Sequence, residues 1–341
     1  MKRGLVLFAI VGAGATAMGI AACAQQAPTE QQAPPAQAAP QAQAGQAGGG
    51  GAAGGGAAAP ERPSLQLEKV RNNLYQLPIF NQSNAPGATT TIFVSENNGV
   101  ILVDTKNPGS GKAIIENVKK VTDKPITTII NTHTHNDHLG GNLEFEPQVE
   151  VIVQENTVGY MKGLPQFKDG QNADRLPKKT FKDKMTLFSG NDSIDLYHFG
   201  PAHTGGDAFV VFRNLRVMAA GDVVAATGTP VMDLANGGSA LQWGQTIAKA
   251  AAGIKNVDLI TRGHTSQTCD WACFVEYGQF MTAYADAARA AHKAGKTVEQ
   301  AVAEIPTAMG PRWKDYFAGL SGRNPGTKAN VTAFYEELNK K

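Results

Sequence analysis

The residues best suited to chemistry stand together in one hexapeptide, His133-Thr134-His135-Asn136-Asp137-His138, directly after a β-branched run at 126–130. On an extended segment, residues i and i+2 point the same way, so His133 and His135 can hold one metal ion. Asp137 and His138 follow as the chain turns into a Gly-rich stretch, and they can hold a second ion beside the first. Imidazole and carboxylate ligands together favour zinc, with manganese or iron as alternatives. The segment therefore predicts a site for two metals.

Three further candidate ligands each follow an apolar run that reads as a strand. His203 comes after the run at 193–199, Asp222 after 216–220, and His264 after 257–261. Binding sites in open α/β sheets form at the carboxyl ends of the strands, which share one edge. Five of the seven histidines in the chain belong to this set. We therefore expect all seven candidate ligands to converge at one sheet edge.

The elements that must position these ligands have an α/β pattern. Helical spacing of apolar residues at 112–121 lies between two strand-like runs, and Ala-rich helical spacing dominates the C-terminal region. No repeat of fixed period is present. The expected strands are 74–77, 90–94, 99–104, 126–130, 150–153, 193–199, 208–212, 216–220 and 257–261, and the expected helices are 112–121, 277–293, 298–304 and 329–338.

Composition narrows the class of protein. The 341 residues include 31 basic and 29 acidic ones, for a net charge of +2, so there is no electrostatic basis for binding nucleic acid. Three cysteines are too few for a disulfide framework or a four-cysteine zinc site.

Cys269 and Cys273 are four residues apart, and both a disulfide and two free thiols are compatible with the sequence. On a regular helix, this spacing would hold the β-carbons wider than the roughly 3.8 Å that a disulfide requires.

Residues 1–23 read as an export signal rather than as part of the fold. Lys2 and Arg3 form a basic start, and the apolar run that follows is short and rich in Gly and Ala. The run ends in Ile20-Ala21-Ala22-Cys23, which resembles a bacterial lipobox; an ordinary cleavage site near the alanines is the alternative. Lipidation of Cys23 would attach the protein to a membrane without spanning it. The sequence thus predicts an exported, periplasmic lipoprotein.

The segment 24–63 is composed almost entirely of Ala, Gln, Gly and Pro. It has no aromatic or large aliphatic side chain to bury against the entropy cost of ordering, which predicts a disordered linker. The folded domain is therefore expected at 64–341, long enough for one α/β body with a substantial core.

With its downstream His203, Asp222 and His264, the His-x-His-x-Asp-His motif resembles that of the metallo-β-lactamase superfamily, over about 67–264. The resemblance implies an αββα sandwich and a binuclear metallohydrolase. It implies that His133, His135 and His203 hold the first metal, that Asp137, His138 and His264 hold the second, and that Asp222 bridges them. Two zinc ions sharing a water would lower its pKa, and the resulting hydroxide would attack a substrate carbonyl. Asp137 is the candidate catalytic residue, orienting that water or moving its proton.

The identity of two ligands bears on the substrate. True metallo-β-lactamases place cysteine or serine where this chain has Asp222, and the cysteine subclass lacks the histidine equivalent to His138. The pattern here resembles hydroxyacylglutathione hydrolases and lactonases more closely, which favours a small-molecule ester, thioester or lactone. The export signal favours lactams and lactones over cytosolic thioesters, so β-lactam hydrolysis is kept as an alternative.

Two further alternatives differ in functional class. One is a catalytically silent periplasmic metal-binding protein built on the same fold. Seven nitrogen and oxygen ligands argue against a closed structural zinc site, which generally takes four ligands. The other is a redox di-iron member, which usually carries an additional flavin domain; the segments above predict one folded body.

Overall fold

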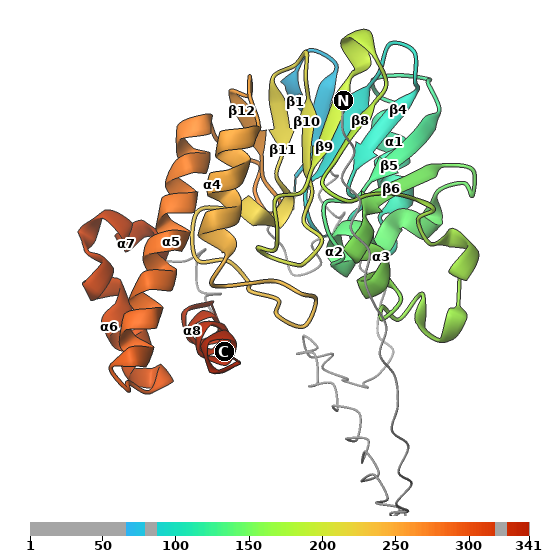
Figure 1. The fold of residues 1–341 in the computed structure, drawn as a ribbon. Coiled ribbons are helices and arrows are strands. Elements are labelled where there is room, and N and C mark those ends of the chain that lie inside the picture. The colour runs from blue at the N-terminus through green and yellow to red at the C-terminus, as the bar shows by residue number, and fades with distance from the viewer. Residues whose placement is uncertain (1–65, 79–86, 318–325, 341) are drawn as a thin grey trace, which may run out of the picture. The chain divides into compact units, whose positions relative to one another are not determined.

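The computed structural model describes residues 66–78, 87–317 and 326–340 (Figure 1). The expected export signal at 1–23, Cys23, the linker at 24–63 and the start of the domain at 64 lie outside these residues.

Two mixed β-sheets form the centre of the domain (Figure 1). Strands β1 to β4 of the first sheet are antiparallel and β4 to β7 are parallel. In the second sheet β12 pairs with β11 in parallel, and the other pairs are antiparallel. The first sheet runs β1 (Glu68–Arg71), β2 (Leu74–Leu77), β3 (Thr90–Val94), β4 (Val100–Val103), β5 (Ile126–Ile130), β6 (Glu150–Gln154), β7 (Lys179–Phe181); the second runs β12 (Leu259–Thr261), β11 (Val217–Ala219), β10 (Phe209–Phe212), β9 (Ile194–Tyr197), β8 (Lys184–Leu187).

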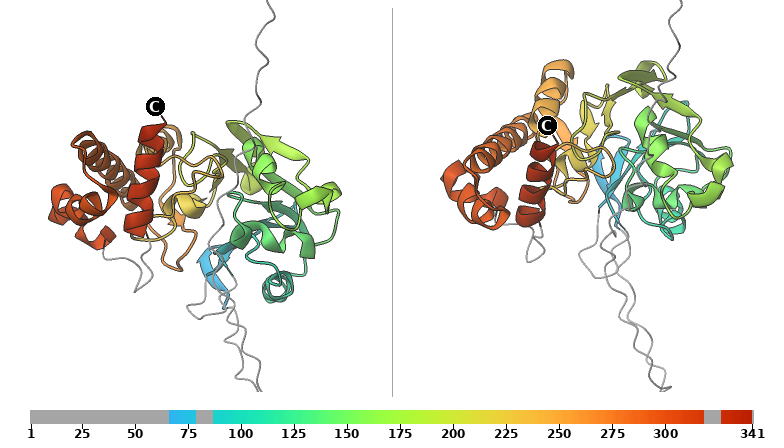
Figure 2. Two further views of the ribbon diagram at one scale, coloured as in Figure 1. Left: turned by 90° about the horizontal axis from the view of Figure 1, so that it is seen from below. Right: turned by 60° about the horizontal axis from the view of Figure 1, so that its bottom comes forward.

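Helices cover the outer faces of both sheets (Figures 1 and 2). Helix α1 (Gly111–Val118) packs on the first sheet, and the C-terminal helices form a layer on the second. The remaining helices are α2 (Asn136–Leu139), α3 (Glu155–Met161), α4 (Trp243–Gly253), α5 (Trp271–Lys293), α6 (Val298–Met309), α7 (Lys314–Phe317) and α8 (Gly326–Asn339).

Four apolar cores lie in the described part of the domain, the smallest of them where α2 and α3 pack on β6. Phe93 of the first sheet and Phe212 of the second meet in the core between the sheets, with ring centroids 5.2 Å apart. A second core joins α1 to the first sheet, and a third joins the second sheet to α4, α5, α6 and α8. The order helix, sheet, sheet, helix is the predicted αββα sandwich, and this prediction is confirmed.

The strands expected from apolar runs are all present, with ends shifted by a few residues, but several elements were not predicted. The edge strands β1, β7 and β8 are short and Lys-containing, so they have no apolar run to reveal them. Helix α4 was not predicted either; its first residue, Trp243, is fully buried in the helical layer.

Cys269 and Cys273 form a disulfide, with their Cα atoms 5.9 Å apart. Only Cys273 lies on α5, because the helix begins after its N-cap, Asp270. Cys269 precedes the helix and pairs with Ile260 in an isolated β-bridge. The helical spacing that argued against a bond therefore does not apply to this pair.

One buried carboxylate links the β3–β4 turn to the second sheet. Asp192 is 2% exposed and accepts hydrogen bonds from the backbone N–H groups of Glu96 and Asn97 (2.7 and 2.9 Å) and from the side chains of Ser95 and Asn98. Burial alone would raise the pKa of Asp192, but these donors outweigh it and hold the pKa below its ordinary value.

This network predicts a pH-dependent loss of stability in Asp192→Asn. Because the folded pKa is depressed, the carboxylate stabilises the fold above its unfolded pKa of about 3.9, and this contribution is lost as pH falls below that value. Since hydrogen bonds to a charged group contribute about 1.5–3 kcal/mol, we expect a loss of about 2 kcal/mol at pH 7. Urea unfolding at pH 7 and below pH 4 checks this; a difference that stays constant with pH would contradict it.

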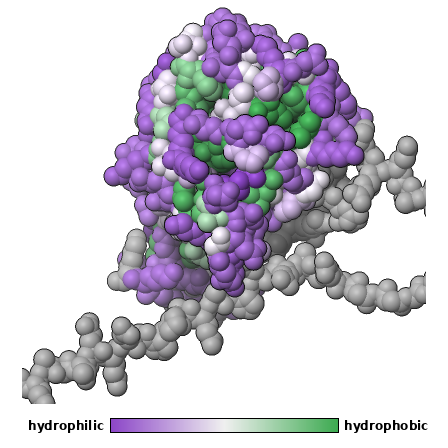
Figure 3. Space-filling view, turned by 90° about the vertical axis from the view of Figure 1, so that its right-hand side faces the viewer, coloured by the Kyte–Doolittle hydropathy of each residue, from purple (hydrophilic) through white to green (hydrophobic). Residues whose placement is uncertain are grey.

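Among the helices in the described part of the chain, none has both the length and the apolar character needed to cross a bilayer. The face on the right of Figure 1 is mostly hydrophilic, with separate hydrophobic areas (Figure 3).

Candidate metal centre

All seven predicted ligands lie at the carboxyl ends of strands, as expected from the sequence. His133 and His135 follow β5, while Asp137 and His138 lie on the short helix α2 directly behind them. The other ligands follow strands of the second sheet: His203 comes after β9, Asp222 after β11 and His264 after β12. Side chains from both sheets therefore meet at the same edge of the sandwich.

The structure brings the seven side chains together in two groups. In each group, the potential ligand atoms lie within 4.8 Å of one another. These groups match the two ligand sets that the resemblance implied. The first comprises His133, His135, His203 and Asp222, and the second Asp137, His138 and His264.

Asp222 lies between the two groups. Its Oδ2 is 3.6 Å from Nε2 of His203 in the first group and 3.0 Å from Nε2 of His264 in the second. Its Oδ1 is 3.3 Å from Nε2 of His138. A carboxylate in this position could bind a metal ion in each of the two groups, which is what a bridging ligand must do.

A neighbouring group orients each of three imidazoles toward the centre. Nδ1 of His203 donates to the carbonyl of Val231 (2.8 Å), which leaves Nε2 facing inward. Nε2 of His135 bonds to Asp233 (2.6 Å), and Nδ1 of His138 bonds to Asp104 (2.7 Å). Carboxylate and carbonyl partners of this kind fix the tautomer and ring orientation of metal-binding histidines.

Sequence reasoning missed two of these supporting residues, Asp104 and Asp233. Asp104 ends the apolar run of β4, so the strand-end rule used for the ligands could have found it. The carboxylate also accepts from the backbone N–H and hydroxyl of Thr132 (2.8 and 2.7 Å), next to His133. Asp233 lies in a loop without periodicity, and no sequence signal distinguishes it.

The donor atoms at the centre fit a divalent metal. Nε2 of His133 and Oδ1 of Asp222 are buried and make no hydrogen bond, a costly state that a cation would relieve; Nε2 of His138 approaches Oδ1 to 3.3 Å as an ion-pair contact only. Nδ1 of His135 and Nε2 of His203 are 3.0 Å apart, close to the separation of two ligands bound to one ion at about 2.0–2.1 Å. Nitrogen and carboxylate oxygen are suitable ligands for zinc.

The electrostatics favour metal binding in both groups. Burial lowers the pKa of His133 well below its ordinary value and the pKa of His203 to about 4, which keeps both imidazoles neutral. Burial also opposes charge on His138 and His264, but nearby carboxylates together outweigh it and raise both pKa values. Asp222 contributes most in each case, with Asp104 adding to the effect on His138 and Asp137 to that on His264. These two histidines in turn hold the pKa of Asp222 well below its usual range, against the effect of burial. A cation would replace the protons of His138 and His264.

Asp233→Ala is expected to weaken metal binding without unfolding the protein. The substitution removes the partner that turns Nδ1 of His135 toward the first group, and losing such a supporting contact costs about 10–100-fold in metal affinity. Competition with a chromophoric zinc chelator measures the change. Asp258→Ala, which removes an exposed carboxylate paired with Arg71 and Arg216, is the control; equal affinities for the two variants would contradict the orienting role.

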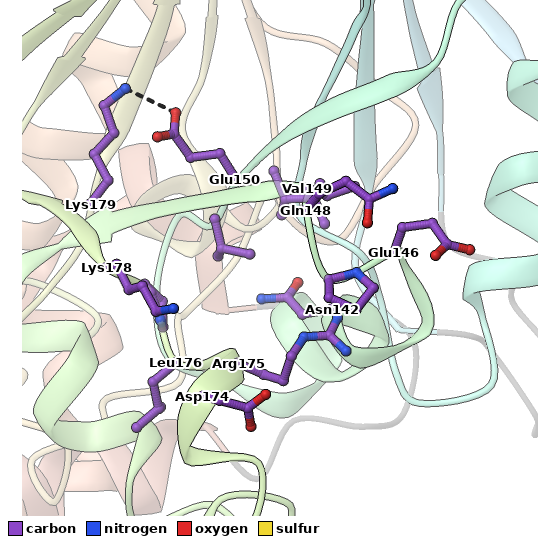
Figure 4. Close-up of a pocket in the computed structure, with 14 residues that line it drawn as sticks. Asn142, Glu146, Gln148, Val149, Glu150, Asp174, Arg175, Leu176, Lys178 and Lys179 are labelled. Atoms are coloured by element: carbon purple, nitrogen blue, oxygen red, sulfur yellow. Dashed lines mark hydrogen bonds and ion pairs between the residues drawn. The ribbon is translucent and has the colours of Figure 1, made fainter.

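A separate hollow of about 410 Å³ lies away from the ligands, between the segments 142–151 and 174–179 (Figure 4). None of the seven ligands lines it. Its charges are partly paired: Lys179 binds Glu150 at 2.9 Å, and Arg175 donates to the carbonyl of Phe145. This hollow has no part in the metal centre.

Comparisons with known proteins agree with the fold. Residues 84–264 match the family model of the metallo-beta-lactamase superfamily. A metallo-beta-lactamase type 2 from Elizabethkingia meningoseptica is 23% identical over 216 residues, covering 62% of this chain and 81% of that protein. The alpha subunit of a 2,4-dinitroanisole O-demethylase from Nocardioides sp. (strain JS1661) is 28% identical over 166 residues, or 48% of this chain and 47% of that protein.

Solved structures share the fold at low identity. DIM-1 metallo-beta-lactamase has a TM-score of 0.53 at 17% identity, covering 64% of this chain and 97% of that chain. A double mutant of the sec-alkyl sulfatase PisA1 has a TM-score of 0.63 at 15% identity, covering 80% of this chain and 50% of that chain.

The sandwich and its His/Asp cluster define a metal-dependent hydrolase, a class whose members act on small-molecule substrates. The chain belongs to the metallo-β-lactamase superfamily.

Proposed function

We propose that this protein is an exported hydrolase that binds two zinc ions and cleaves a small carbonyl substrate, such as an ester, thioester or lactone. The position of Asp222 carries the proposal, since its two oxygens lie 3.0–3.6 Å from imidazoles of both ligand groups. Two ions held this way supply a water of lowered pKa and a polarised substrate carbonyl.

The ligands differ in exposure, and this sets their roles. The side chains of His138 and His203 are 0% and 2% exposed, so the surrounding packing holds both imidazoles in fixed positions. The side chains of Asp137 and His264 are 33% and 27% exposed, with Oδ2 of Asp137 3.3 Å from Nε2 of His264. Asp137 is therefore placed at the open side of the centre, where it can orient water or pass a proton to solvent.

Hydrolysis of a β-lactam is the second candidate. It is favoured by the metallo-beta-lactamase type 2 relatives, of which this chain covers about four fifths. The ligand set favours the first candidate, since a carboxylate takes the place of the cysteine or serine of true metallo-β-lactamases.

The deciding experiment assays the zinc-loaded protein and its chelator-stripped form on a cephalosporin, a homoserine lactone and a thioester. Zinc-dependent turnover of the lactone or the thioester supports the proposal. Turnover of the cephalosporin alone would establish the second candidate instead. Two bound metals with no turnover on any of the three would favour a metal-binding protein without catalysis.

The export and lipid anchor are proposed from the sequence of residues 1–23. Labelling with a radioactive fatty acid in a bacterial host tests them. Cys23→Ser should lose the label and leave the membrane fraction, and labelling that survives this substitution would refute attachment at Cys23.

A further inference from the structure

The loop at 231–241 orients two of the three histidines in the first ligand group. The carbonyl of Val231 accepts from His203, and the carboxylate of Asp233 bonds to His135. The loop contains no helix or strand, and its internal hydrogen bonds are those of a turn: the N–H of Gly238 donates to the carbonyl of Asp233 (2.8 Å), and the N–H of Asn236 donates to its carboxylate (3.0 Å). Whatever holds the loop also sets the direction of both imidazoles.

Part of the support comes from the turn that carries His203. The N–H of Asp233 donates to the carbonyl of His203 (3.2 Å), and the N–H of Ser239 donates to the carbonyl of Ala202 (3.0 Å). These bonds tie the loop to the turn at 202–205, but they do not tie either segment to the helical layer.

The helical layer reaches the end of the loop from two helices. Arg289 of α5 donates to the carbonyl of Leu241 (3.2 Å), and a carboxylate on the C-terminal helix α8 accepts two further hydrogen bonds from the loop. Oε1 of Glu337 accepts from the hydroxyl of Ser239 (2.6 Å), and its Oε2 accepts from the backbone N–H of Leu241 (3.1 Å). The Ser239 hydroxyl oxygen also accepts from the N–H of Gln242, the N-cap of α4. One side chain thus binds the end of the loop at the point where α4 begins.

Helix α8 is itself firmly packed. Phe334 is fully buried and lies edge-on to Tyr284 of α5, with ring centroids 4.9 Å apart. Asn339 bonds to His292 of α5 at 2.8 Å, and Figure 2 shows α8 beside the other helices of this layer. Packing against α5 therefore fixes the position of the helix that carries Glu337.

Elsewhere α8 and the loop are separated by a groove. The groove, of about 680 Å³, has Met232, Asp233, Leu234 and Ala235 on the loop side and α8 on the other, from Lys328 to the exposed Glu336. Within the described residues, the hydrogen bonds between α8 and the loop are the two made by Glu337. Helix α8 also lies outside the segment matched by the superfamily, which ends at residue 264.

We propose that Glu337 is a positioning residue for the first ligand group, acting through the loop at 231–241 on His135 and His203. The proposal rests on metal binding at the centre and not on the identity of a substrate. It assigns to the C-terminal helix, outside the matched domain, a role in metal affinity.

Glu337→Ala tests this proposal through zinc affinity, measured by chelator competition without substrate. We expect affinity to fall by about tenfold, the lower end of the range for residues that support a ligand. Hydrogen exchange should rise at the amides of Asp233 and Ser239, with the amides of β5 unchanged. Glu336→Ala, the exposed neighbour on the same helix, makes the same charge change and should bind zinc like wild type.

A conservative variant separates hydrogen bonding from charge. The amide of Glu337→Gln can accept from the N–H of Leu241 and donate to the hydroxyl of Ser239, so we expect affinity within about twofold of wild type. If Glu337→Ala does not fold, Ser239→Ala removes one of the two bonds from the loop side and should weaken zinc binding several-fold. Wild-type zinc affinity in Glu337→Ala, even with a lower melting temperature, would overturn the proposal. So would a loss in Glu337→Gln as large as that in Glu337→Ala.

Discussion

Replacing Asp222 with alanine is expected to abolish activity and to remove or loosen both metals while the fold stays intact. The carboxylate approaches His203 of the first group and His138 and His264 of the second, so its loss affects both groups at once. Removal of a residue that merely supports a ligand costs about 10–100-fold, so we expect the loss of a shared ligand to exceed a hundredfold in kcat/KM. Elemental analysis and kinetics of the purified variant give the measurement.

The fold should survive because the histidines can adjust. Without Asp222, His138 and His264 lose the largest of the interactions that raise their pKa values. Asp104 still faces His138 and Asp137 still faces His264, so each imidazole can release its proton or keep a carboxylate partner. Asp258→Ala, which removes an exposed carboxylate paired with Arg71 and Arg216, is the matched control and should keep its metals. A wild-type metal content in Asp222→Ala would refute the bridging position.

The ligand set could be read from the sequence because each ligand is tied to a local signal. His133 and His135 have the i, i+2 spacing of an extended segment, and the others each follow a strand recognisable from its apolar run. Parallel and mixed sheets bring such strand ends to a common edge, so convergence follows from local structure. Asp104 obeys the same rule at the end of β4 and could have been found with the ligands.

The supports outside the strands could not be predicted, because they depend on tertiary contacts. Asp233 reaches His135 across 98 residues of sequence, and Glu337 reaches Ser239 across the same distance. Neither residue has a spacing or neighbour that marks it. The disulfide shows the same limit: whether Cys269 lies on the helix or before it decides if the pair can bond, and the helix start depends on the cap made by Asp270.

Glycine 263 is the second position where one substitution is expected to disable the centre. It lies between β12 and His264, and its backbone is in close contact with the side chain of Asp222. A Cβ built on Gly263 would stand 1.8 Å from Oδ1 of Asp222, far inside any allowed contact. Because Asp222 is buried, its carboxylate can avoid the added methyl group only by moving out of its position between the two ligand groups.

Gly263→Ala is therefore expected to mimic Asp222→Ala, with activity reduced more than a hundredfold and the metal content lowered, although every ligand is still present. The comparison with Gly159→Ala controls for adding a methyl group to glycine. Nothing lies within 4 Å of a Cβ at that exposed helical position, so this control should be stabilised by up to about 1 kcal/mol and keep full activity. Metal analysis separates displacement of the carboxylate from a folding defect. If folded Gly263→Ala retained both its metals and its activity, the backbone at this position would not be what holds Asp222 between the two groups.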